Sequence, residues 1–182
     1  MNNYFDKYIK YKNKYLKLKN KINNQFGGEE IRNSSIILIC NNSILFTYDH
    51  NKEYWVTPGG NCEENEHPRF TAFREFLEEI GCISKLESIQ NIQSYSSEIF
   101  NGNEQSNYIN NKTCIYVYEI NDKSKIPEFK FNDEMDMMLW VDIDFLKDND
   151  FTIVTNDLNS IDNRNNEIID YVSNSLKKYF KE

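Results

Sequence analysis

Hydrophobic residues recur at helical spacing along the first part of the chain. Successive apolar positions there are three or four residues apart: Tyr4, Tyr8, Tyr11, Tyr15, Leu18 and Ile22. This spacing predicts an apolar stripe on a helix. Gly27 and Gly28 then end the pattern, as expected of a helix stop followed by a hinge. The sequence therefore predicts a helical arm over residues 1–26 and a separate domain over residues 27–182.

Beyond the two glycines, the pattern changes to short apolar runs typical of β-strands. Residues 35–40 and 43–48 are rich in isoleucine and are separated by Asn41 and Asn42, which predicts a β-hairpin. Further strands are predicted over residues 54–56, 86–95, 113–120 and 139–141. The polar stretch 101–112 predicts a loop, and we interpret it as an insert between two of these strands.

Two later segments return to helical periodicity. Residues 68–80 begin at Pro68, which suits a first helical turn, and Gly81 follows as a helix stop. Residues 163–180 place five apolar side chains on one face: Ile168, Ile169, Val172, Leu176 and Phe180. Strands interleaved with two helices, without regular β-α-β repeats, predict a mixed α/β fold of the α+β type.

The segment 68–80 carries acidic residues on the face opposite its apolar stripe. At about 100° per residue, Glu75, Glu78 and Glu79 share an arc of about 100°, while Phe73, Phe76 and Leu77 point away from it. Like charges at this spacing repel one another. Because carboxylate oxygens suit hard divalent cations, the pattern favours a site for Mg²⁺ or Mn²⁺.

The residues around this helix match a known motif at every position. The stretch GNCEENEHPRFTAFREFLEEIGC resembles the Nudix box, which is a glycine, five residues, a glutamate, seven residues, then Arg-Glu-apolar-x-Glu-Glu-x-Gly-apolar. The matching residues are Gly60, Glu66, Arg74, Glu75, Phe76, Glu78, Glu79, Gly81 and Cys82. Residues 55–60 and 139–141 are similar to further segments of the same family. The resemblance implies a Nudix-like α/β/α sandwich with a mixed sheet.

The resemblance also implies roles for individual residues. Glu75, Glu78 and Glu79 are expected to bind Mg²⁺, with Mn²⁺ as an alternative, and one of them to act as general base. The carbonyl of Gly59 is expected to complete the metal shell. Many relatives supply one more acid from outside the box, and Glu134 or Asp136 is the candidate here.

Three motif residues are expected to shape the site. Arg74 would orient the glutamates by ion pairing, and Glu66 would brace the loop against the helix. Gly60 opens the motif. The resemblance implies a hydrolase that cleaves a diphosphate linkage in a nucleoside diphosphate attached to another group. A nucleotide-binding Nudix module without activity is the alternative.

The motif leaves recognition of the attached group open, and no substrate-binding residue is assigned. Aromatic residues outside the helix are candidates: Tyr54, Tyr95, Phe100, Tyr108 and Trp140. The chain resembles the small, MutT-like members that act on nucleotides.

Charge divides the chain as the hydrophobic pattern does. The net charge is −8, with 21 basic and 29 acidic residues. Residues 1–26 hold seven lysines and one acid (7 − 1 = +6), so 14 basic and 28 acidic residues (14 − 28 = −14) remain for residues 27–182. The acidic domain argues against a general nucleic-acid-binding surface.

The basic arm permits several interpretations. Its lysines and tyrosines are similar to the N-termini of giant-virus proteins, and viral Nudix proteins include mRNA-decapping enzymes. The arm could then hold RNA by its phosphates. Alternatively, it packs on its own acidic domain, or forms a homodimer through the tyrosine stripe. Disorder of the arm, or contact with a membrane surface, is the remaining interpretation.

The cysteine content and the length of the apolar runs bear on the cellular compartment of the protein. Four cysteines lie far apart without a CxxC pair, and only two histidines accompany them, so neither a disulfide framework nor a structural zinc site is expected. No apolar run reaches the roughly 18–20 residues that span a bilayer. We expect an intracellular, cytoplasmic protein, located in the host cytoplasm if it is viral.

Overall fold

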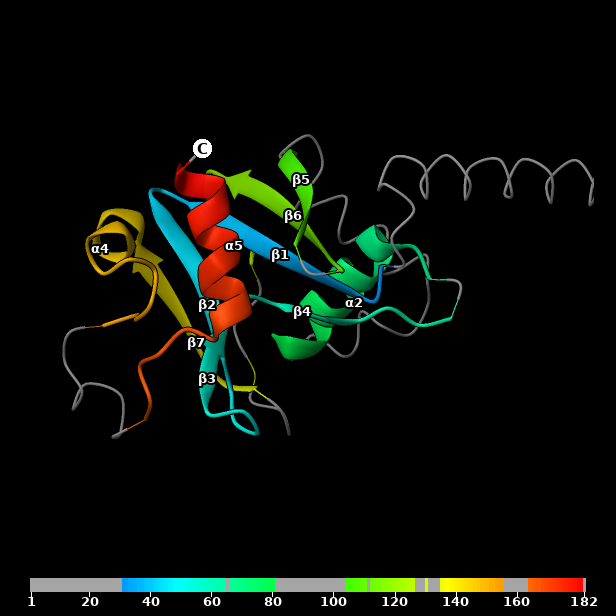
Figure 1. Cartoon of the computed structure of the whole chain (residues 1–182), viewed down its shortest axis with the longest axis horizontal. Coiled ribbons are helices and arrows are strands. Elements are labelled where there is room, and N and C mark those ends of the chain that lie inside the picture. Colours follow the sequence, from blue (N-terminus) through cyan, green and yellow to red (C-terminus); the bar gives the residue numbers. More distant parts are fainter. Residues whose placement is uncertain are drawn as a thin grey trace, which may run out of the picture. The chain divides into compact units, whose positions relative to one another are not determined.

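The computed structural model describes residues 31–64, 66–80, 104–110, 112–126, 130, 135–155 and 164–181 (Figure 1). The chain divides into two units, Met1–Ile31 and Arg32–Glu182. The predicted arm over residues 1–26 and the predicted strand over residues 86–95 lie outside the described residues. The fold below is therefore that of the second unit.

Among the described residues, seven strands form one mixed sheet. They are β1 (Asn33–Cys40), β2 (Ser43–Asp49), β3 (Tyr54–Val56), β4 (Gly59–Asn61), β5 (Glu104–Asn110), β6 (Thr113–Ile120) and β7 (Met135–Asp142). The order is β3-β2-β1-β6-β5, while β4 pairs with β1 and β7 pairs with β2. The β1–β6 pair is parallel and the others are antiparallel. The predicted mixed sheet is confirmed.

The predicted hairpin forms as expected. Asn41 and Asn42 connect β1 to β2 with φ values of 48° and 59°. A two-residue hairpin turn of this kind requires positive φ at both positions, and asparagine tolerates it better than most residues. The two asparagines therefore fix the register Ile39↔Ile44 and Cys40↔Ser43.

Beyond this turn, β1 and β2 no longer pair with each other, and each pairs with another strand. Their mutual pairing covers only the residues next to the turn. Farther along, β1 pairs with β4 through Ser34↔Gly60 and Ser35↔Gly59, and β2 pairs with β3 through Thr47↔Val56. At the level of Thr47 and Gly59, the sheet is therefore divided into two strand pairs, β1–β4 and β2–β3. A side chain from a helix that covers this position can contact both pairs.

Helices cover both faces of the sheet. The helix α2 (Pro68–Glu79) lies on the face that includes Tyr116 and Tyr118: the ring of Phe73 lies 5.8 Å from that of Tyr118, and the Arg69 guanidinium lies 5.3 Å from that of Tyr116. The opposite face packs against α4 (Ile143–Asp148) and α5 (Asp170–Lys181). A single turn of 3₁₀ helix, η2 (Lys123–Lys125), follows β6. This α/β/α arrangement is the fold predicted from the resemblance.

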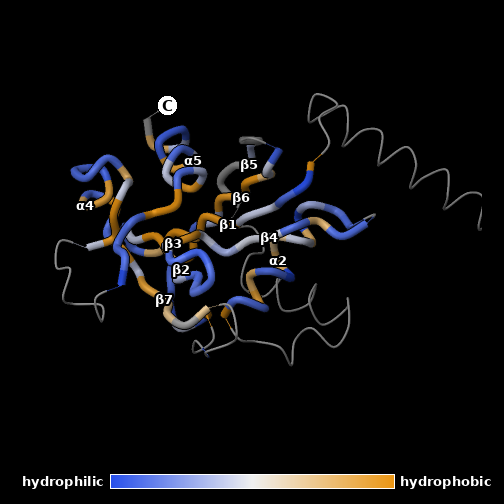
Figure 2. The backbone as a smooth tube through the Cα atoms, turned by 60° about the horizontal axis from the view of Figure 1, so that its bottom comes forward, coloured by the Kyte–Doolittle hydropathy of each residue, from blue (hydrophilic) through white to orange (hydrophobic). Residues whose placement is uncertain are grey.

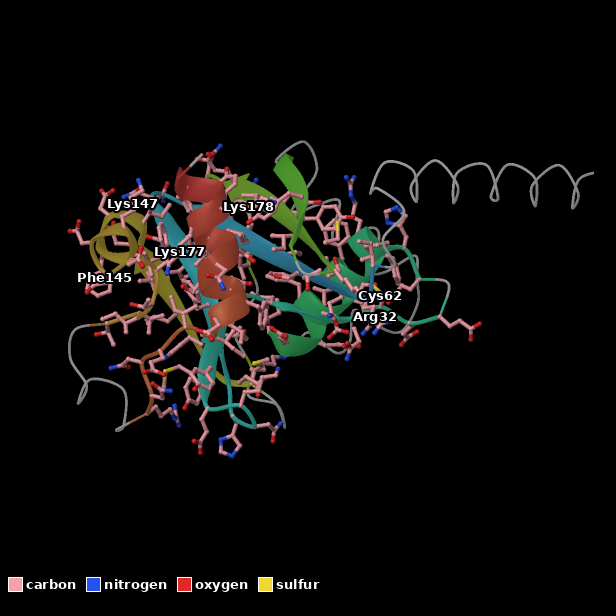
Figure 3. All side chains as sticks on the ribbon, in the orientation of Figure 1. Arg32, Cys62, Phe145, Lys147, Lys177 and Lys178 are labelled. Atoms are coloured by element: carbon pink, nitrogen blue, oxygen red, sulfur yellow. The ribbon has the colours of Figure 1, made fainter. Side chains whose placement is uncertain are left out.

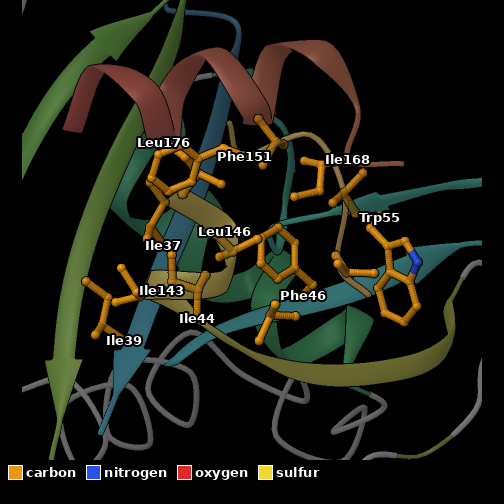
Figure 4. Close-up of a cluster of buried hydrophobic side chains, with 14 of the residues drawn as sticks. Ile37, Ile39, Ile44, Phe46, Trp55, Ile143, Leu146, Phe151, Ile168 and Leu176 are labelled. Atoms are coloured by element: carbon orange, nitrogen blue, oxygen red, sulfur yellow. The ribbon is translucent and has the colours of Figure 1, made fainter. Parts of the chain in front are cut away.

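The larger core lies between the sheet and the helices α4 and α5 (Figure 4). Its side chains include Ile37, Ile39, Ile44, Phe46, Val117, Leu146, Phe151, Val172 and Leu176. Each aliphatic or aromatic side chain buried in this way contributes about 1.5–3 kcal/mol. Hydrophobic positions accordingly concentrate in the central strands, whereas the connections between elements are mostly hydrophilic (Figure 2).

Two sequence predictions are wrong. The stretch 101–112 includes a strand, β5, which pairs antiparallel with β6. Its composition is polar because strand pairing uses backbone groups and β5 ends the sheet order. The helix predicted from residue 163 begins only at Asp170, because Glu167 and Ile168 form β-bridges with Ile153 and Trp55.

Three elements differ in extent from their prediction or were not predicted. The strand predicted at 139–141 extends over the whole of β7, and the Gly59-Gly60 pair belongs to a short strand that was not predicted, β4. The helix α4 was not predicted. In the part of the chain that the structure describes, no helix has the length and apolar character needed to cross a membrane.

Candidate active site

The helix α2 is fixed at both ends. His67 is its N-cap residue, and the His67 Nδ1 atom accepts a hydrogen bond from the N–H of Arg69 at 3.1 Å. Pro68 follows in the first turn, where its missing N–H has no cost. Phe76 and Leu77 are almost fully buried and anchor the apolar face. The rotation of the helix, and hence the direction of its carboxylates, is set by this packing.

Arg74 holds the acidic residues of the motif together. Its Nε and Nη2 atoms each lie 3.0 Å from one oxygen of Glu66, a bidentate ion pair. Its Nη1 atom lies 2.8 Å from Glu75 Oε1 and 3.0 Å from Glu78 Oε2. The Nη2 atom also donates to the carbonyl of Asn61 at 3.1 Å. One guanidinium therefore connects the loop after β4 to two carboxylates of α2.

Glu66 attaches this loop to the helix. Only 7% of its side chain is exposed, and it accepts hydrogen bonds from Thr71 Oγ1 at 2.7 Å and from the N–H of Glu63 at 3.1 Å. Burial alone raises the pKa of Glu66. The hydrogen bonds from Arg74, Thr71 and Glu63 outweigh burial, so that the pKa lies below the ordinary value.

The lowered pKa of Glu66 predicts a pH-dependent contribution to stability. A carboxyl with a lower pKa in the folded state stabilises the protein above its unfolded pKa of about 4.3, and this contribution is lost as the pH falls toward the folded value. We expect Glu66→Gln to lower the melting temperature at pH 7, and this difference to shrink below about pH 4. Thermal denaturation of both proteins between pH 3.5 and 7 measures it. A difference that stays constant over this range would contradict the assignment.

Glu79 is the buried carboxylate of α2. It is 4% exposed, and its oxygens accept hydrogen bonds from Thr47 Oγ1 at 3.1 Å and from the N–H of Gly59 at 3.3 Å. Thr47 belongs to β2 and Gly59 to β4, so the carboxylate connects the two strand pairs where the sheet divides. Burial raises the pKa of Glu79 well above its ordinary value, and the charge of Glu75 acts in the same direction.

The two glycines of β4 allow close approach by different elements. A Cβ atom on Gly60 would lie 2.4–2.6 Å from the carboxylate atoms of Glu75 on α2. A Cβ atom on Gly59 would lie 2.4 Å from the carbonyl oxygen of Ser34 and 2.6 Å from the Cα of Ser35, both on β1. Glu75 therefore lies against Gly60, while Glu79 accepts from the N–H of Gly59. The loop that leaves β4 stays beside β1, since Cys62 donates to the carbonyl of Arg32 at 2.8 Å (Figure 3).

This donor set has the chemistry of a hard-cation site. The carboxylates of Glu75 and Glu79, together with the nearby backbone of Gly59, supply the oxygen ligands that Mg²⁺ and Mn²⁺ prefer. Within the described ranges, however, no three acidic, histidine or cysteine side chains converge as a ready metal-binding group. Glu75 and Glu78 turn toward Arg74, while Glu79 turns toward Thr47 and Gly59. Each carboxylate thus has a protein partner that relieves the repulsion between them.

Most of the remaining expected site residues are not among the described residues. Glu134 and Gly81 are outside the described residues, as is the side chain of Asp136. Tyr95 and Phe100 are likewise outside. Tyr54 begins β3, half-buried.

Tyr108 and Trp140 have partners away from α2. The Tyr108 hydroxyl donates to the carbonyl of Ser175 at 2.6 Å, and its ring stacks on Tyr179. Trp140 lies on β7 with the ammonium of Lys123 over its ring, 4.8 Å from the ring centre. Tyr108 thus packs on α5, which leaves Tyr54 and Trp140 as the described aromatic candidates for a substrate contact.

One residue that contacts Glu79, Thr47, was missed from the sequence. Thr47 lies between Phe46 and Tyr48, which are buried in β2, and a polar residue at such a position was a signal that it meets a buried partner. Burial raises the pKa of Tyr171, in the first turn of α5, and the charges of Glu79 and Asp49 act in the same direction.

The comparisons with known proteins agree with this geometry. The structure has a mixed sheet between helices, with a glutamate-rich helix held against a Gly-Gly strand. The model of the NUDIX domain matches residues 30–160. The chain therefore belongs to the Nudix family, and the expectation of a Nudix hydrolase is confirmed at the level of the family. A search of curated proteins finds no match.

Several solved structures match this chain at low sequence identity. The MutT protein from Methanosarcina mazei Go1 is 13% identical, with a TM-score of 0.49 over 83% of this chain and 93% of that chain. A NUDIX-family hydrolase from Clostridium perfringens is 18% identical, with a TM-score of 0.43 over 82% and 95%. A C. elegans Ap4A hydrolase is 11% identical, with a TM-score of 0.43 over 64% and 84%. Family membership follows from the domain match, and the substrate does not follow from these structures.

Proposed function

We propose that this protein is a Mg²⁺-dependent hydrolase that cleaves a diphosphate linkage in a nucleoside diphosphate attached to another group. Mn²⁺ is the alternative metal. The observation that carries the proposal is the position of Glu79, whose buried carboxylate contacts the Gly59 backbone while Glu75 lies against Gly60. A buried, negatively charged group is costly unless a partner compensates it, and a divalent cation with a diphosphate is a partner of the right chemistry.

In this proposal, residues of α2 and β4 bind the cation, and one residue of α2 also accepts a proton. Glu75, Glu78 and Glu79, with the carbonyl of Gly59, would hold the cation. When bound, it supplies neutralisation of the diphosphate charge and activation of a water molecule. One of the glutamates accepts the proton of the attacking water. Because the glutamates are fixed on one helix, they would already be positioned when the cation, water and substrate bind.

Arg74 and Glu66 position the glutamates of α2 and do not contact the reacting atoms. Arg74 contacts Glu75 and Glu78 through one nitrogen, so it sets the distance between these carboxylates before a cation enters. Glu66 orients Arg74 through the bidentate pair. Both are positioning residues in this proposal.

The experiment is a turnover assay on a chemically broad panel. Wild-type protein is incubated with Mg²⁺ and nucleoside triphosphates, nucleotide sugars, dinucleoside polyphosphates or capped RNA, and the products are separated. We expect a nucleoside monophosphate and the remaining phosphorylated fragment from at least one class. Nucleotide binding without turnover of any member would instead support a binding module that kept the fold.

A second candidate function, mRNA decapping, is favoured by the charge of the N-terminal arm. Residues 1–26 carry a net +6 on a chain whose remaining residues carry −14. Such a segment gains affinity for RNA by releasing condensed cations. We propose residues 1–26 as the arm and residues 27–182 as the hydrolase domain.

Deletion of residues 1–26 tests this second function. If the arm holds RNA, the deletion raises KM for long capped RNA more than tenfold at low salt, with a smaller effect at high salt, because phosphate contacts are screened. Hydrolysis of a free cap dinucleotide is the matched control and stays unchanged. Equal cleavage of long capped RNA by both proteins would rule the RNA role out.

A further inference from the structure

An ion pair connects the end of β2 to the turn that precedes β3 (Figure 1). The ammonium group of Lys52, in this turn, pairs with the Oδ2 atom of Asp49, the last residue of β2. The side chain of Asp49 is 6% exposed, whereas that of Lys52 is 54% exposed. A buried carboxylate therefore holds the end of a side chain that is otherwise open to solvent.

Asp49 lies on the same face of β2 as Thr47. Side chains two residues apart along a strand share one face of the sheet. Phe46 and Tyr48 belong to the core that packs against α4 and α5, whereas Thr47 between them donates to Glu79 on α2. The pairing of β2 with β3 continues without a shift from Thr47 to Asp49, so this alternation is kept. Asp49 therefore points to the face that α2 covers.

The Asp49–Lys52 pair is thus close to the proposed cation site but outside it. Two residues of strand separate Asp49 from Thr47, a distance of about 7 Å, whereas the oxygen ligands of Mg²⁺ lie about 2.0–2.1 Å from the metal. Electrostatics agree with this placement: burial is the main cause of the raised pKa of Glu79, and the positive charge of Lys52 acts in the opposite direction. Lys52 can therefore reach a phosphate group that extends beyond the metal-bound oxygens.

The ammonium group of Lys52 can leave Asp49 without disturbing the turn. Asp49 Oδ1 accepts hydrogen bonds from the N–H groups of Asn51 and Lys52, both at 3.0 Å, and these remain when the ammonium group moves. The N–H of Glu53 donates to the carbonyl of Asp49 at 2.8 Å, which closes the turn through backbone atoms. Because the lysine stem is flexible, its ammonium group can exchange a carboxylate for a phosphate while the backbone stays in place.

The cation of α2 is committed to another role. Arg74 forms ion pairs with Glu66, Glu75 and Glu78. If its guanidinium turned toward a phosphate, these carboxylates would lose the partner that holds them together. Lys52 carries a positive charge whose movement leaves all three glutamates in place, so it is the better candidate for a direct phosphate contact.

We propose that Lys52 binds a phosphate group of the substrate that lies outside the cleaved linkage, and thereby selects nucleotides with three or more phosphates over nucleotide sugars. This inference rests on the proposed function, because it assigns a selectivity to the same site. When such a substrate binds, the ammonium group exchanges Asp49 for phosphate oxygens, and hydrogen bonds between two charged groups are among the strong ones. A nucleotide sugar has no phosphate at this position, so Lys52 stays with Asp49.

Lys52→Met tests this selectivity, because it keeps most of the stem and removes the charge. We expect kcat/KM for nucleoside triphosphates to fall about tenfold or more, while kcat/KM for nucleotide sugars stays within about twofold. Lys52→Arg, which keeps the charge, should retain the preference for triphosphates. The melting temperature of both variants should stay close to that of the wild type, since ion pairs of exposed side chains add little stability. Equal changes of kcat/KM for both substrate classes in Lys52→Met, or no change in either, would overturn the proposal.

A second lysine provides the matched control. Lys147 pairs with Asp144 at 3.8 Å, also three residues away, and its side chain is 47% exposed. It belongs to α4, on the opposite face of the sheet from α2. Lys147→Met should leave kcat/KM unchanged for both substrate classes. If it shifts selectivity as much as Lys52→Met does, the cause is the loss of a surface charge and not a phosphate contact.

Phosphate binding is also measured without nucleotide turnover, so that failure of the hydrolase proposal and failure of this inference are distinguishable. Isothermal titration calorimetry in the presence of Mg²⁺ compares inorganic tripolyphosphate with pyrophosphate. We expect the wild-type protein to bind tripolyphosphate about tenfold more tightly or more, and Lys52→Met to reduce this ratio to about twofold, while Lys147→Met keeps the wild-type ratio. This result would support the inference even if no nucleotide were cleaved. The same ratio in Lys52→Met and wild type, or no binding of either ion, would overturn it.

Discussion

Glu79→Gln is expected to reduce turnover by about 10²–10⁴-fold while leaving the protein folded. The substitution keeps the shape of the side chain and removes its charge. Glu79 is the carboxylate that contacts both strand pairs, through Thr47 on β2 and Gly59 on β4. Loss of a group that holds the cation or accepts the proton costs a rate factor of this size.

The stability effect of Glu79→Gln should be small because two contributions oppose each other. The glutamine oxygen can accept from the N–H of Gly59, but its NH2 group can pair with the Thr47 hydroxyl only if that hydroxyl accepts instead of donating. We expect this exchange of a charged for a neutral acceptor to cost about 0.5–1.5 kcal/mol. On the other hand, the neutral amide avoids the desolvation of a buried carboxylate, which is the cause of the raised pKa of Glu79. Steady-state hydrolysis and thermal denaturation measure the two effects separately.

An exposed glutamate provides the control for Glu79. Glu119 lies on β6 and is exposed, although its strand neighbours are buried. Glu119→Gln should retain wild-type turnover. If Glu79→Gln keeps more than a tenth of the wild-type rate under the same conditions, the buried carboxylate is not part of the reaction.

Substitution of the two adjacent glycines by alanine is expected to impair different properties: stability at Gly59 and activity at Gly60. In Gly59→Ala, the new Cβ meets backbone atoms, Ser34 O at 2.4 Å and Ser35 Cα at 2.6 Å. Backbone in a paired strand cannot move aside, so we expect a loss of about 3 kcal/mol in the free energy of unfolding. In Gly60→Ala, the Cβ meets the Glu75 carboxylate, the flexible end of a side chain. We expect near-normal stability and a loss of about 10²-fold in kcat/KM, because a displacement of about 1 Å at a catalytic group costs that much.

The pair of variants separates folding from catalysis at adjacent positions. Urea denaturation gives the free energy of unfolding, and initial rates at saturating Mg²⁺ give kcat/KM. Adding Glu75→Asp to Gly60→Ala shortens the displaced side chain and should recover part of the lost activity. A stable, fully active Gly60→Ala protein would show that the carboxylate of Glu75 need not lie where the structure places it.

The sequence predicted the elements whose local signals agree. The hairpin has two asparagines at positions that need positive φ, and α2 has a proline in its first turn and an apolar stripe. The short strand β3 follows from Tyr54, Trp55 and Val56 alone. In each case, the residues that favour the element are within it, so no distant contact was needed.

Other features depend on contacts between distant segments. The strand β5 is polar, and only its pairing with β6 makes it a strand. Ile168 has the spacing of a helical residue but pairs with Trp55, so α5 starts later than its periodicity predicts. Tertiary pairing overrides local preference in both places.

The site itself was predicted only in part. Helical geometry placed Glu75, Glu78 and Glu79 on one face, but it treated them as equivalent. The structure distinguishes them: Glu79 is buried, whereas 41% of the Glu78 side chain is exposed. This difference arises because the sheet divides beside the end of α2, which no local pattern shows.

The most direct test of the account is product analysis after hydrolysis in ¹⁸O-labelled water with Mg²⁺, with wild-type and Glu79→Gln proteins assayed in parallel on the substrate panel. We predict that the wild-type protein releases a nucleoside monophosphate from a diphosphate-linked nucleotide, with one ¹⁸O atom on a single product phosphate, and that Glu79→Gln releases almost none. Cleavage at a bond other than the diphosphate, or equal release by both proteins, would contradict it.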